Sequence, residues 1–136
     1  MSEPALLCEV PIPVRWRDLD AFNHVNNATF LTYLEEARLH WFGTVPGPWF
    51  TEQSAPVVAA ATANYRRQLG WPAQLVVALY CERIGNSSLT IGFRIVDATD
   101  RAIVYADGQT VLVWIDTTSG KSMPLPDAIR AACGAK

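Results

Sequence analysis

The spacing of hydrophobic and polar positions changes along the chain, and this change predicts the order of its structural elements. An apolar run from Leu6 to Val14 is expected to form a strand, whose prolines indicate a sheet edge or an irregular start. Between residues 28 and 42, apolar side chains recur at spacings of three and four, which predicts a helix. Polar positions in this helix form only a narrow stripe, so we expect other elements to wrap most of it.

After a loop rich in proline and glycine, the pattern changes to long strands. We expect four of them, separated by turn-forming residues, at 56–69, 75–84, 88–97 and 102–116. A short helix is predicted over residues 127–133. The resulting order is a strand, a buried helix and a meander of four strands, which we interpret as a single domain spanning residues 1–136.

The predicted sheet has more apolar surface than one helix can cover. Apolar residues occupy both faces of the last strand, from Val111 to Ile115. Because each apolar face must be buried against something, we predict an obligate homodimer or a higher oligomer such as a homotetramer.

Composition narrows the classes of function. Half of the 136 residues are hydrophobic, which favours a well-buried core. The net charge of −2 gives no indication of nonspecific binding to nucleic acid. No apolar run reaches the roughly 18–20 residues of a membrane span, and Met1 to Pro4 lack a signal-peptide start. The three cysteines are odd in number and widely separated, so they form neither a metal motif nor a disulfide framework. We expect a cytoplasmic protein, and the sequence has no Gly-rich phosphate loop or metal cluster that would hold a cofactor.

The most polar segment between two apolar elements runs from Asp18 to Asn27. It holds two carboxylates, one histidine and three amides within ten residues. The N-terminus of the following helix offers unsatisfied N–H groups that can stabilise a developing oxyanion. A carboxylate upstream can act at the same point as a nucleophile or a base. The segment therefore predicts an acyl-transfer site, with a set of helix caps and turn contacts as the alternative.

A family resemblance supports the first interpretation. The stretch W-R-D-L-D-A-F-N-H-V-N-N-A-T-F, followed by Y-L-E-E-A-R, closely resembles the active-site signature of hotdog-fold thioesterases in the 4-hydroxybenzoyl-CoA thioesterase-like superfamily. It is most similar to the acyl-CoA and acyl-ACP branches that carry H-V-N-N. The resemblance continues at residues 64–67, 83–88 and 124–126, and so covers nearly the whole chain. It implies an α+β hotdog fold, a curved antiparallel sheet of about five strands around a central helix, with dimers that join their sheets edge to edge.

The resemblance also implies catalytic roles. Asp20 matches the aspartate that attacks the thioester carbonyl or activates water against it, whereas Asp18 is expected to orient the loop. Asn27 begins the helix, where a backbone N–H is implied to polarise the carbonyl oxygen. His24 is expected to carry a proton or to fix the substrate, with a hydrogen-bonded loop histidine as the alternative. Phe30 departs from the tyrosine that is common at its position.

Further residues are implied to contact substrate or to support the helix. Asn23 is expected either to orient water or the carboxylate, or only to form a turn. Glu35 and Arg38 are expected to pair at i,i+3 for structural reasons. Arg66, Arg67 and Arg83 would bind the phosphates of the CoA or carrier-protein arm. The predicted substrate-binding residues are Asn23, Asn26, Tyr65, Arg66, Arg67, Arg83, Asn86 and Ser87.

The function predicted from the sequence is hydrolysis of acyl-CoA to free acid and CoA by Asp20, with the helix N-terminus near Asn27 as oxyanion hole. An acyl-ACP thioesterase and a non-catalytic acyl-thioester-binding protein are the alternatives. A cysteine hydrolase using Cys81 or Cys8 with His24 is a further hypothesis. The substrate would be the only partner besides other copies of the chain, with no nucleic acid and no membrane.

Overall fold

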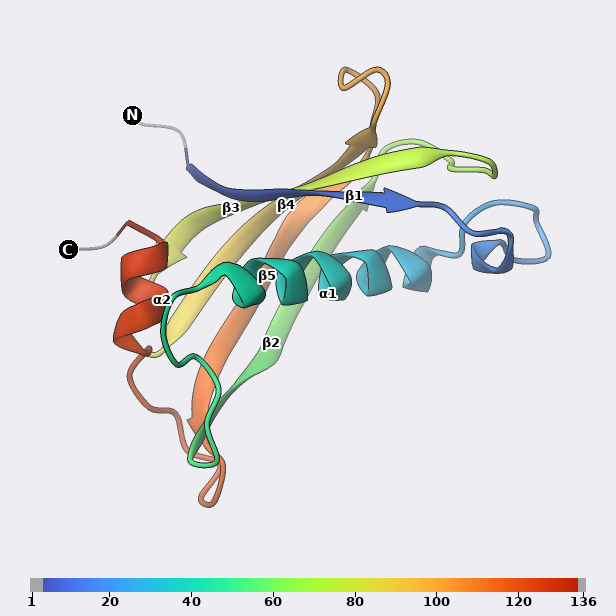
Figure 1. Cartoon of the computed structure of the whole chain (residues 1–136). Coiled ribbons are helices and arrows are strands. Elements are labelled where there is room, and N and C mark those ends of the chain that lie inside the picture. Colours follow the sequence, from blue (N-terminus) through green and yellow to red (C-terminus); the bar gives the residue numbers. More distant parts are fainter. Residues whose placement is uncertain (1–3, 135–136) are drawn as a thin grey trace.

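A single antiparallel sheet curves around a long helix in the computed structural model, which describes residues 4–134 (Figure 1). The strands are β1 (Ala5–Pro13), β2 (Ser54–Tyr65), β3 (Gln74–Ile84), β4 (Ser88–Asp97) and β5 (Val104–Asp116). The α-helices are α1 (Asn27–Thr44) and α2 (Asp127–Ala132), and a short 3₁₀-helix covers Trp16–Asp18. Two parts of the predicted domain lie outside the described residues, namely residues 1–3 and residues 135–136. The first of them belongs to the N-terminal segment that was compared with a signal peptide.

The hydrophobic pattern located each of these strands and both α-helices, but the predicted end of β2 was wrong. The strand predicted over 56–69 ends at Tyr65. Beyond it, the N–H groups of Arg66 and Arg67 both donate to the carbonyl of Tyr105, at 2.8 and 3.3 Å. The carbonyl of Leu69 then accepts from Val25 at 2.7 Å, so this segment leaves the sheet and packs beside the loop before α1. The 3₁₀-helix was not predicted.

The predicted four-strand meander was also wrong in one connection. The strand order is β1-β3-β4-β5-β2, so only β3, β4 and β5 follow one another as neighbours. Strand β2 pairs with β5 instead, and the chain crosses to the far side of the sheet to begin β3. As a result β1 and β2 are the two edges, and each carries one row of unpaired backbone groups in the described part of the chain.

The core lies between α1 and the inner face of the sheet. Strands β3 and β4 contribute inner-face side chains that are at most 1 % exposed, namely Leu75, Val77, Leu79, Leu89, Ile91 and Ile95. Helix α1 packs Leu34 and Ala37 against them, and both are fully buried. Full burial of such an aliphatic side chain contributes about 1.5–3 kcal/mol, so this layer holds helix and sheet together.

One flank of α1 is open, so the helix is wrapped less completely than its pattern predicted. Leu31 and Leu39 are 42 % and 63 % exposed on the side that faces β2. The predicted i,i+3 ion pair is absent, since no carboxylate among residues 4–134 lies within 4 Å of the Arg38 guanidinium. Nothing in the described chain covers this flank. No helix among the described residues is both long and apolar enough to cross a membrane.

Candidate active site

A tight turn places Asp20 opposite His24 just before α1. Leu19 and Val25 form an isolated antiparallel bridge, and inside it the N–H of Asp20 donates to the carbonyl of His24 at 3.0 Å. The N–H of Asn23 donates to the carbonyl of Asp20 at 2.9 Å, and Asn23 has a φ of 66°. Asparagine adopts this left-handed conformation more readily than most residues, so Asn23 suits the turn for a backbone reason.

The start of α1 leaves one backbone donor free beside this turn. The side chain of Asn26 accepts from the N–H of Ala28 at 2.8 Å, and its carbonyl accepts from Thr29 at 2.9 Å. The N–H of Asn27 has no acceptor among the described residues. The hydroxyl of Tyr65 donates to the carbonyl of Asn27 at 3.1 Å, which fixes this first turn against the end of β2. A free N–H at a positive helix end is suited to bind an anionic oxygen.

These groups line one open hollow of about 500 Å³. Asp20, His24 and the first turn of α1 form one side of it, and the segment that follows β2 forms the other. Asp20 is only partly buried, and its Oδ1 accepts from the N–H of Phe22 at 2.9 Å. Its Oδ2 has no hydrogen-bond partner in the described chain. The full lining is Asp20, Phe22, His24, Val25, Asn26, Asn27, Phe30, Tyr65, Arg66, Arg67, Gln68 and Leu69.

Asp18 lies two residues before Asp20 in a different environment. It is 4 % exposed, and its carboxylate accepts from the Tyr33 hydroxyl at 2.7 Å, from the Arg15 N–H at 2.9 Å and from the Arg15 guanidinium at 3.1 Å. Burial raises the pKa of Asp18, but these hydrogen bonds and the Arg15 charge more than reverse the effect, so the net pKa is lowered. The carbonyl of Asp18 also accepts from the N–H of Asn26 at 3.1 Å. Asp18 therefore ties the loop to the start of α1.

Tyr33, which reaches Asp18 from α1, was not predicted as a residue of the site. Its position on the apolar face of the helix gave it the pattern of a core residue, and it is indeed 3 % exposed. Burial and the hydrogen bond to Asp18 raise the pKa of its phenol, so Tyr33 stays a neutral donor at physiological pH. Only its hydroxyl, on a helix face otherwise filled by apolar groups, hinted at a polar partner. Gln68 also lines the hollow without having been predicted.

Four of the predicted substrate-binding residues lie outside this hollow. Asn23 is exposed to solvent and is not one of the residues that line the hollow. Arg83, Asn86 and Ser87 lie at the turn between β3 and β4, which is about 30 Å along β3 from the end that adjoins the loop. The carbonyls of Asn86 and Ser87 accept from Leu125 and Trp114, both at 2.9 Å. One chain alone does not bring this turn to Asp20.

The cysteine hypothesis disagrees with the structure. Cys81 faces the core and pairs in the sheet with Ala5, at the end of β1 that is farther from His24. Burial raises the pKa of Cys81, and it raises that of Cys8 to about 11, with a smaller contribution from Glu9. Both thiols are therefore protonated near neutral pH and neither lines the hollow, which removes the thiolate that such a mechanism requires.

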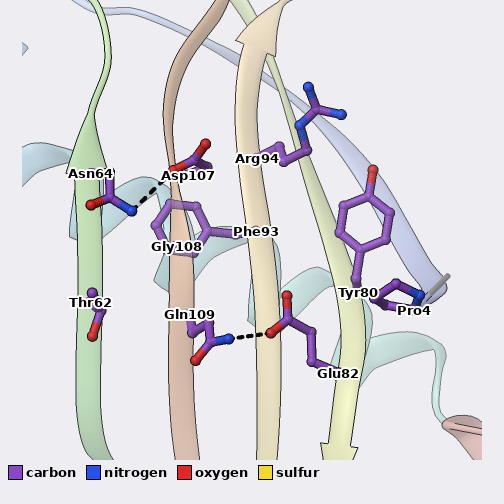
Figure 2. A pocket seen from close by; sticks show the side chains of 10 residues that line it. All are labelled: Pro4, Thr62, Asn64, Tyr80, Glu82, Phe93, Arg94, Asp107, Gly108 and Gln109. Carbon is purple, nitrogen blue, oxygen red and sulfur yellow. Dashed lines mark hydrogen bonds between the residues drawn. The ribbon is translucent and has the colours of Figure 1, made fainter. Parts of the chain in front are cut away.

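A second hollow of about 560 Å³ lies on the opposite face of the sheet (Figure 2). Its charged and amide groups mostly bind one another: Gln109 donates to Glu82, and Asn64 donates to Asp107 at 3.2 Å. It contains no histidine and no helix N-terminus. Arg66, which lines the first hollow, forms an ion pair with Asp107 of this second hollow at 3.1 Å. This face offers no arrangement for acyl transfer.

The architecture and the composition of the first hollow define a class of protein. A curved antiparallel sheet around one long helix is the hotdog fold, and here its helix N-terminus adjoins a carboxylate and an imidazole. The family model of the thioesterase-like superfamily matches residues 14–133, and the chain belongs to this superfamily.

Individual relatives cover nearly the whole chain. The long-chain acyl-CoA thioesterase FadM of Escherichia coli is 30 % identical over 126 residues, which are 90 % of this chain and 93 % of FadM. A solved structure of a candidate acyl-CoA thioesterase from Xanthomonas campestris is 54 % identical, with a TM-score of 0.77, over 86 % of this chain and 99 % of that one. A candidate thioesterase from Pseudomonas aeruginosa is 40 % identical, with a TM-score of 0.84, over 93 % and 98 %.

Proposed function

We propose that this chain is an acyl-CoA thioesterase in which Asp20 acts on the thioester carbonyl. The observation that carries the proposal is that a carboxylate with one free oxygen and a helix N–H without an acceptor line the same hollow. These are the two groups that hydrolysis of a thioester needs, one to bring in oxygen and one to stabilise the oxyanion. The names of FadM and of the Xanthomonas relative support the choice of acyl-CoA as substrate.

The chemistry has two routes through Asp20. As a base, the carboxylate takes a proton from water while the water oxygen adds to the carbonyl carbon, and collapse of the tetrahedral intermediate expels CoA thiolate. As a nucleophile, the carboxylate adds directly, expels the thiolate and leaves an anhydride that water then hydrolyses. In both routes the carbonyl oxygen becomes negative and accepts from the Asn27 N–H. One such donor is worth about 2.7–4 kcal/mol of barrier.

His24 is proposed as the proton carrier. It lines the hollow, and the turn that joins its carbonyl to the N–H of Asp20 holds the two residues on facing positions. A histidine near neutrality can deliver a proton to the departing thiolate and recover one from water. This role fits either route, because both release the same leaving group.

The CoA phosphates need cations at the rim of the hollow. Arg67 lines it and is exposed, whereas the neighbouring Arg66 is paired with Asp107. We therefore assign the first phosphate contact to Arg67. Arginine suits this role because its planar guanidinium binds phosphate through two parallel hydrogen bonds.

We further propose that the working unit is a homodimer, alone or within a homotetramer, joined through β2. A hollow of about 320 Å³ lies between the C-terminal half of α1 and β2, and Phe42, Trp49 and Phe50 line it. Antiparallel pairing of β2 with a second copy would place this aromatic hollow beside Asp20 of the other protomer. The two-fold rotation that relates the two protomers would also bring the turn at Arg83 of one protomer to the end of the sheet that carries Asp20 in the other. The acyl group and the CoA arm would then be bound by both chains.

The test is a thiol-release assay on short, long and aromatic acyl-CoAs, with the matching acyl-ACPs in a parallel series. We expect CoA release from at least one acyl-CoA and its loss in Asp20→Asn. Faster cleavage of acyl-ACP would reassign the substrate class. Tight acyl-CoA binding without turnover would support the non-catalytic alternative, and full activity of Asp20→Asn would refute the role of Asp20.

A further inference from the structure

The two edges of the sheet differ in how well they resist pairing with another chain. Both strands carry a bulge, between Leu6 and Cys8 in β1 and between Val58 and Ala60 in β2. Strand β1 also has two prolines and the charged Glu9, whereas β2 has one proline, Pro56. Strand β2 has no charged residue over its 12 positions, and Val57 and Val58 are 40 % and 50 % exposed. A long, uncharged and apolar edge is suited to receive another strand.

The open flank of α1 continues this apolar surface and adds two charges. Leu31 and Leu39 are exposed on it, one turn before and one turn after Glu35. Two hollows, of about 320 and 260 Å³, separate the flank from β2. Glu35, Arg38 and Val58 line both of them, so these charges lie directly above the strand edge.

Arg38 is the group that needs a partner. It is 9 % exposed, and burial lowers the pKa of its guanidinium despite the opposing effect of Glu35. Within residues 4–134, no carboxylate lies within 4 Å of it, although Glu35 is on the preceding turn. A largely desolvated cation is costly unless an anion compensates it. The two hollows between α1 and β2 that it lines open toward the uncovered edge.

The position of these two charges along the molecule indicates which anion fits. Glu35 and Arg38 lie near the middle of α1, and the hollows place them opposite Val58 and Ala61 near the middle of β2. If β2 pairs antiparallel with its own copy about this midpoint, the two-fold axis passes beside both residues. Around a two-fold axis the same surface patch of both protomers meets, so two neighbouring residues of opposite charge can each contact the other residue's copy, and the patch is then self-complementary.

We propose that Glu35 and Arg38 form two reciprocal ion pairs across a two-fold axis, with Arg38 of each protomer bound to Glu35 of the partner subunit. The inference rests on the dimer suggested above for the composite site and specifies what selects it. The apolar edge of β2 supplies burial, and the charges fix register and orientation, because an alignment that covers this flank without bringing Glu35 of the partner subunit to Arg38 buries an unpaired cation.

The test uses charge reversal and sedimentation analysis across a protein concentration series. Glu35→Arg alone, or Arg38→Glu alone, would place four like charges around the axis. We expect each single variant to dimerise at least about 100-fold more weakly than wild type. Mixing the two variants in equal amounts restores opposite charges only between chains, so we expect a heterodimer of wild-type mass that contains both. Glu36→Arg, an exposed reversal on the same helix that lines neither hollow, is the matched control and should dimerise normally.

Several results would overturn the inference: a monomeric wild type at tens of micromolar, single variants that dimerise like wild type, or a mixture that does not form heterodimers although both chains are folded by circular dichroism. If Arg38→Glu does not fold, the neutral pair Arg38→Met and Glu35→Gln replaces it. Salt should weaken the wild-type dimer but affect the dimers of the neutral variants much less, and equal salt dependence would contradict the ion pairs.

Thiol release from the same samples separates the two proposals. An active dimer insensitive to these charges refutes only the ion pairs, and a charge-dependent dimer without activity refutes only the thioesterase.

Discussion

Asp18 and Asp20 are separated by one residue and have opposite environments. The carboxylate of Asp18 is buried, and Tyr33 and Arg15 saturate it with hydrogen bonds. The carboxylate of Asp20 opens into a hollow of about 500 Å³ and accepts one bond, from the N–H of Phe22. The difference teaches that the D-L-D sequence engages one carboxylate in structural hydrogen bonds and leaves the other open to the hollow, where we propose that it acts on the substrate. A carboxylate whose oxygens are all engaged cannot attack, and one without such bonds cannot hold a loop in place.

The largest expected effect on activity comes from replacing the carboxylate of Asp20. Asp20→Asn keeps the shape of the side chain and can still accept from Phe22, but it can neither take a proton nor attack a carbonyl. We expect kcat for acyl-CoA hydrolysis to fall by about 10³-fold or more, within the range of lost base or nucleophile catalysis. Thermal unfolding should match wild type, because the side chain is partly exposed and makes one hydrogen bond. A large loss of stability would show that Asp20 shares the structural role of Asp18.

The next effect concerns the residue opposite Asp20. His24→Gln keeps hydrogen-bonding capacity but cannot exchange a proton, so we expect kcat to fall by about 10²-fold. A variant with wild-type kcat in the thiol-release assay would make His24 a loop residue and leave Asp20 without its proposed assistant.

A smaller effect, on stability, should follow from removing the Tyr33 hydroxyl that donates a hydrogen bond to Asp18. Tyr33→Phe deletes the hydroxyl that is 2.7 Å from Asp18 and keeps the ring in the core. A hydrogen bond to a charged group is worth about 1.5–3 kcal/mol, and we expect urea unfolding to show a loss in this range. Tyr65→Phe, which deletes a hydroxyl that donates to the uncharged carbonyl of Asn27, is the matched control and should lose less stability. An equal loss of unfolding free energy in both variants would argue against a charge-assisted bond from the Tyr33 hydroxyl.

The smallest expected effect is the acid dependence of that stability. The folded-state pKa of Asp18 is lowered, so its carboxylate stabilises the fold at pH values above the unfolded-state pKa of about 3.9. This contribution is lost as the pH falls through the folded-state value. The difference in unfolding free energy between wild type and Asp18→Asn should therefore be largest near neutral pH and shrink below about pH 4. A difference that is constant from pH 7 to pH 2 would contradict the lowered pKa.

The sequence located most of the fold because its signals are local. Alternation within strands and the spacing of three and four in α1 depend on neighbouring residues, and so do the asparagine cap and the turn before it. The partner of β2 was mispredicted because strand order depends on a crossover that alternation does not encode. Arg66 to Leu69 continued an apolar run but left the sheet, where tertiary hydrogen bonds to Tyr105 and Val25 replaced the ladder.

The candidate site was predictable to the same extent. Asp20, His24 and Asn27 are close in sequence, so the turn that joins them was visible in advance, and the structure places them in one hollow. Tyr33 was not visible as a partner of Asp18, because a hydroxyl on an apolar helix face has the pattern of a core tyrosine. The lack of an ion pair between Glu35 and Arg38 was equally hidden, since i,i+3 spacing permits a contact that the rotamers in this helix do not make.

The most direct test of the division between the two carboxylates compares Asp18→Asn and Asp20→Asn in one experiment. Single-turnover cleavage of the best acyl-CoA substrate, with enzyme in excess, gives the chemical rate constant, and urea unfolding of the same samples gives stability. We predict that Asp20→Asn lowers the rate constant by about 10³-fold with an unchanged unfolding midpoint. Asp18→Asn should lower the midpoint and retain a rate constant at least ten times that of Asp20→Asn. The reverse pattern, with Asp20→Asn active and Asp18→Asn stable but inactive, would contradict the division and assign the chemistry to Asp18.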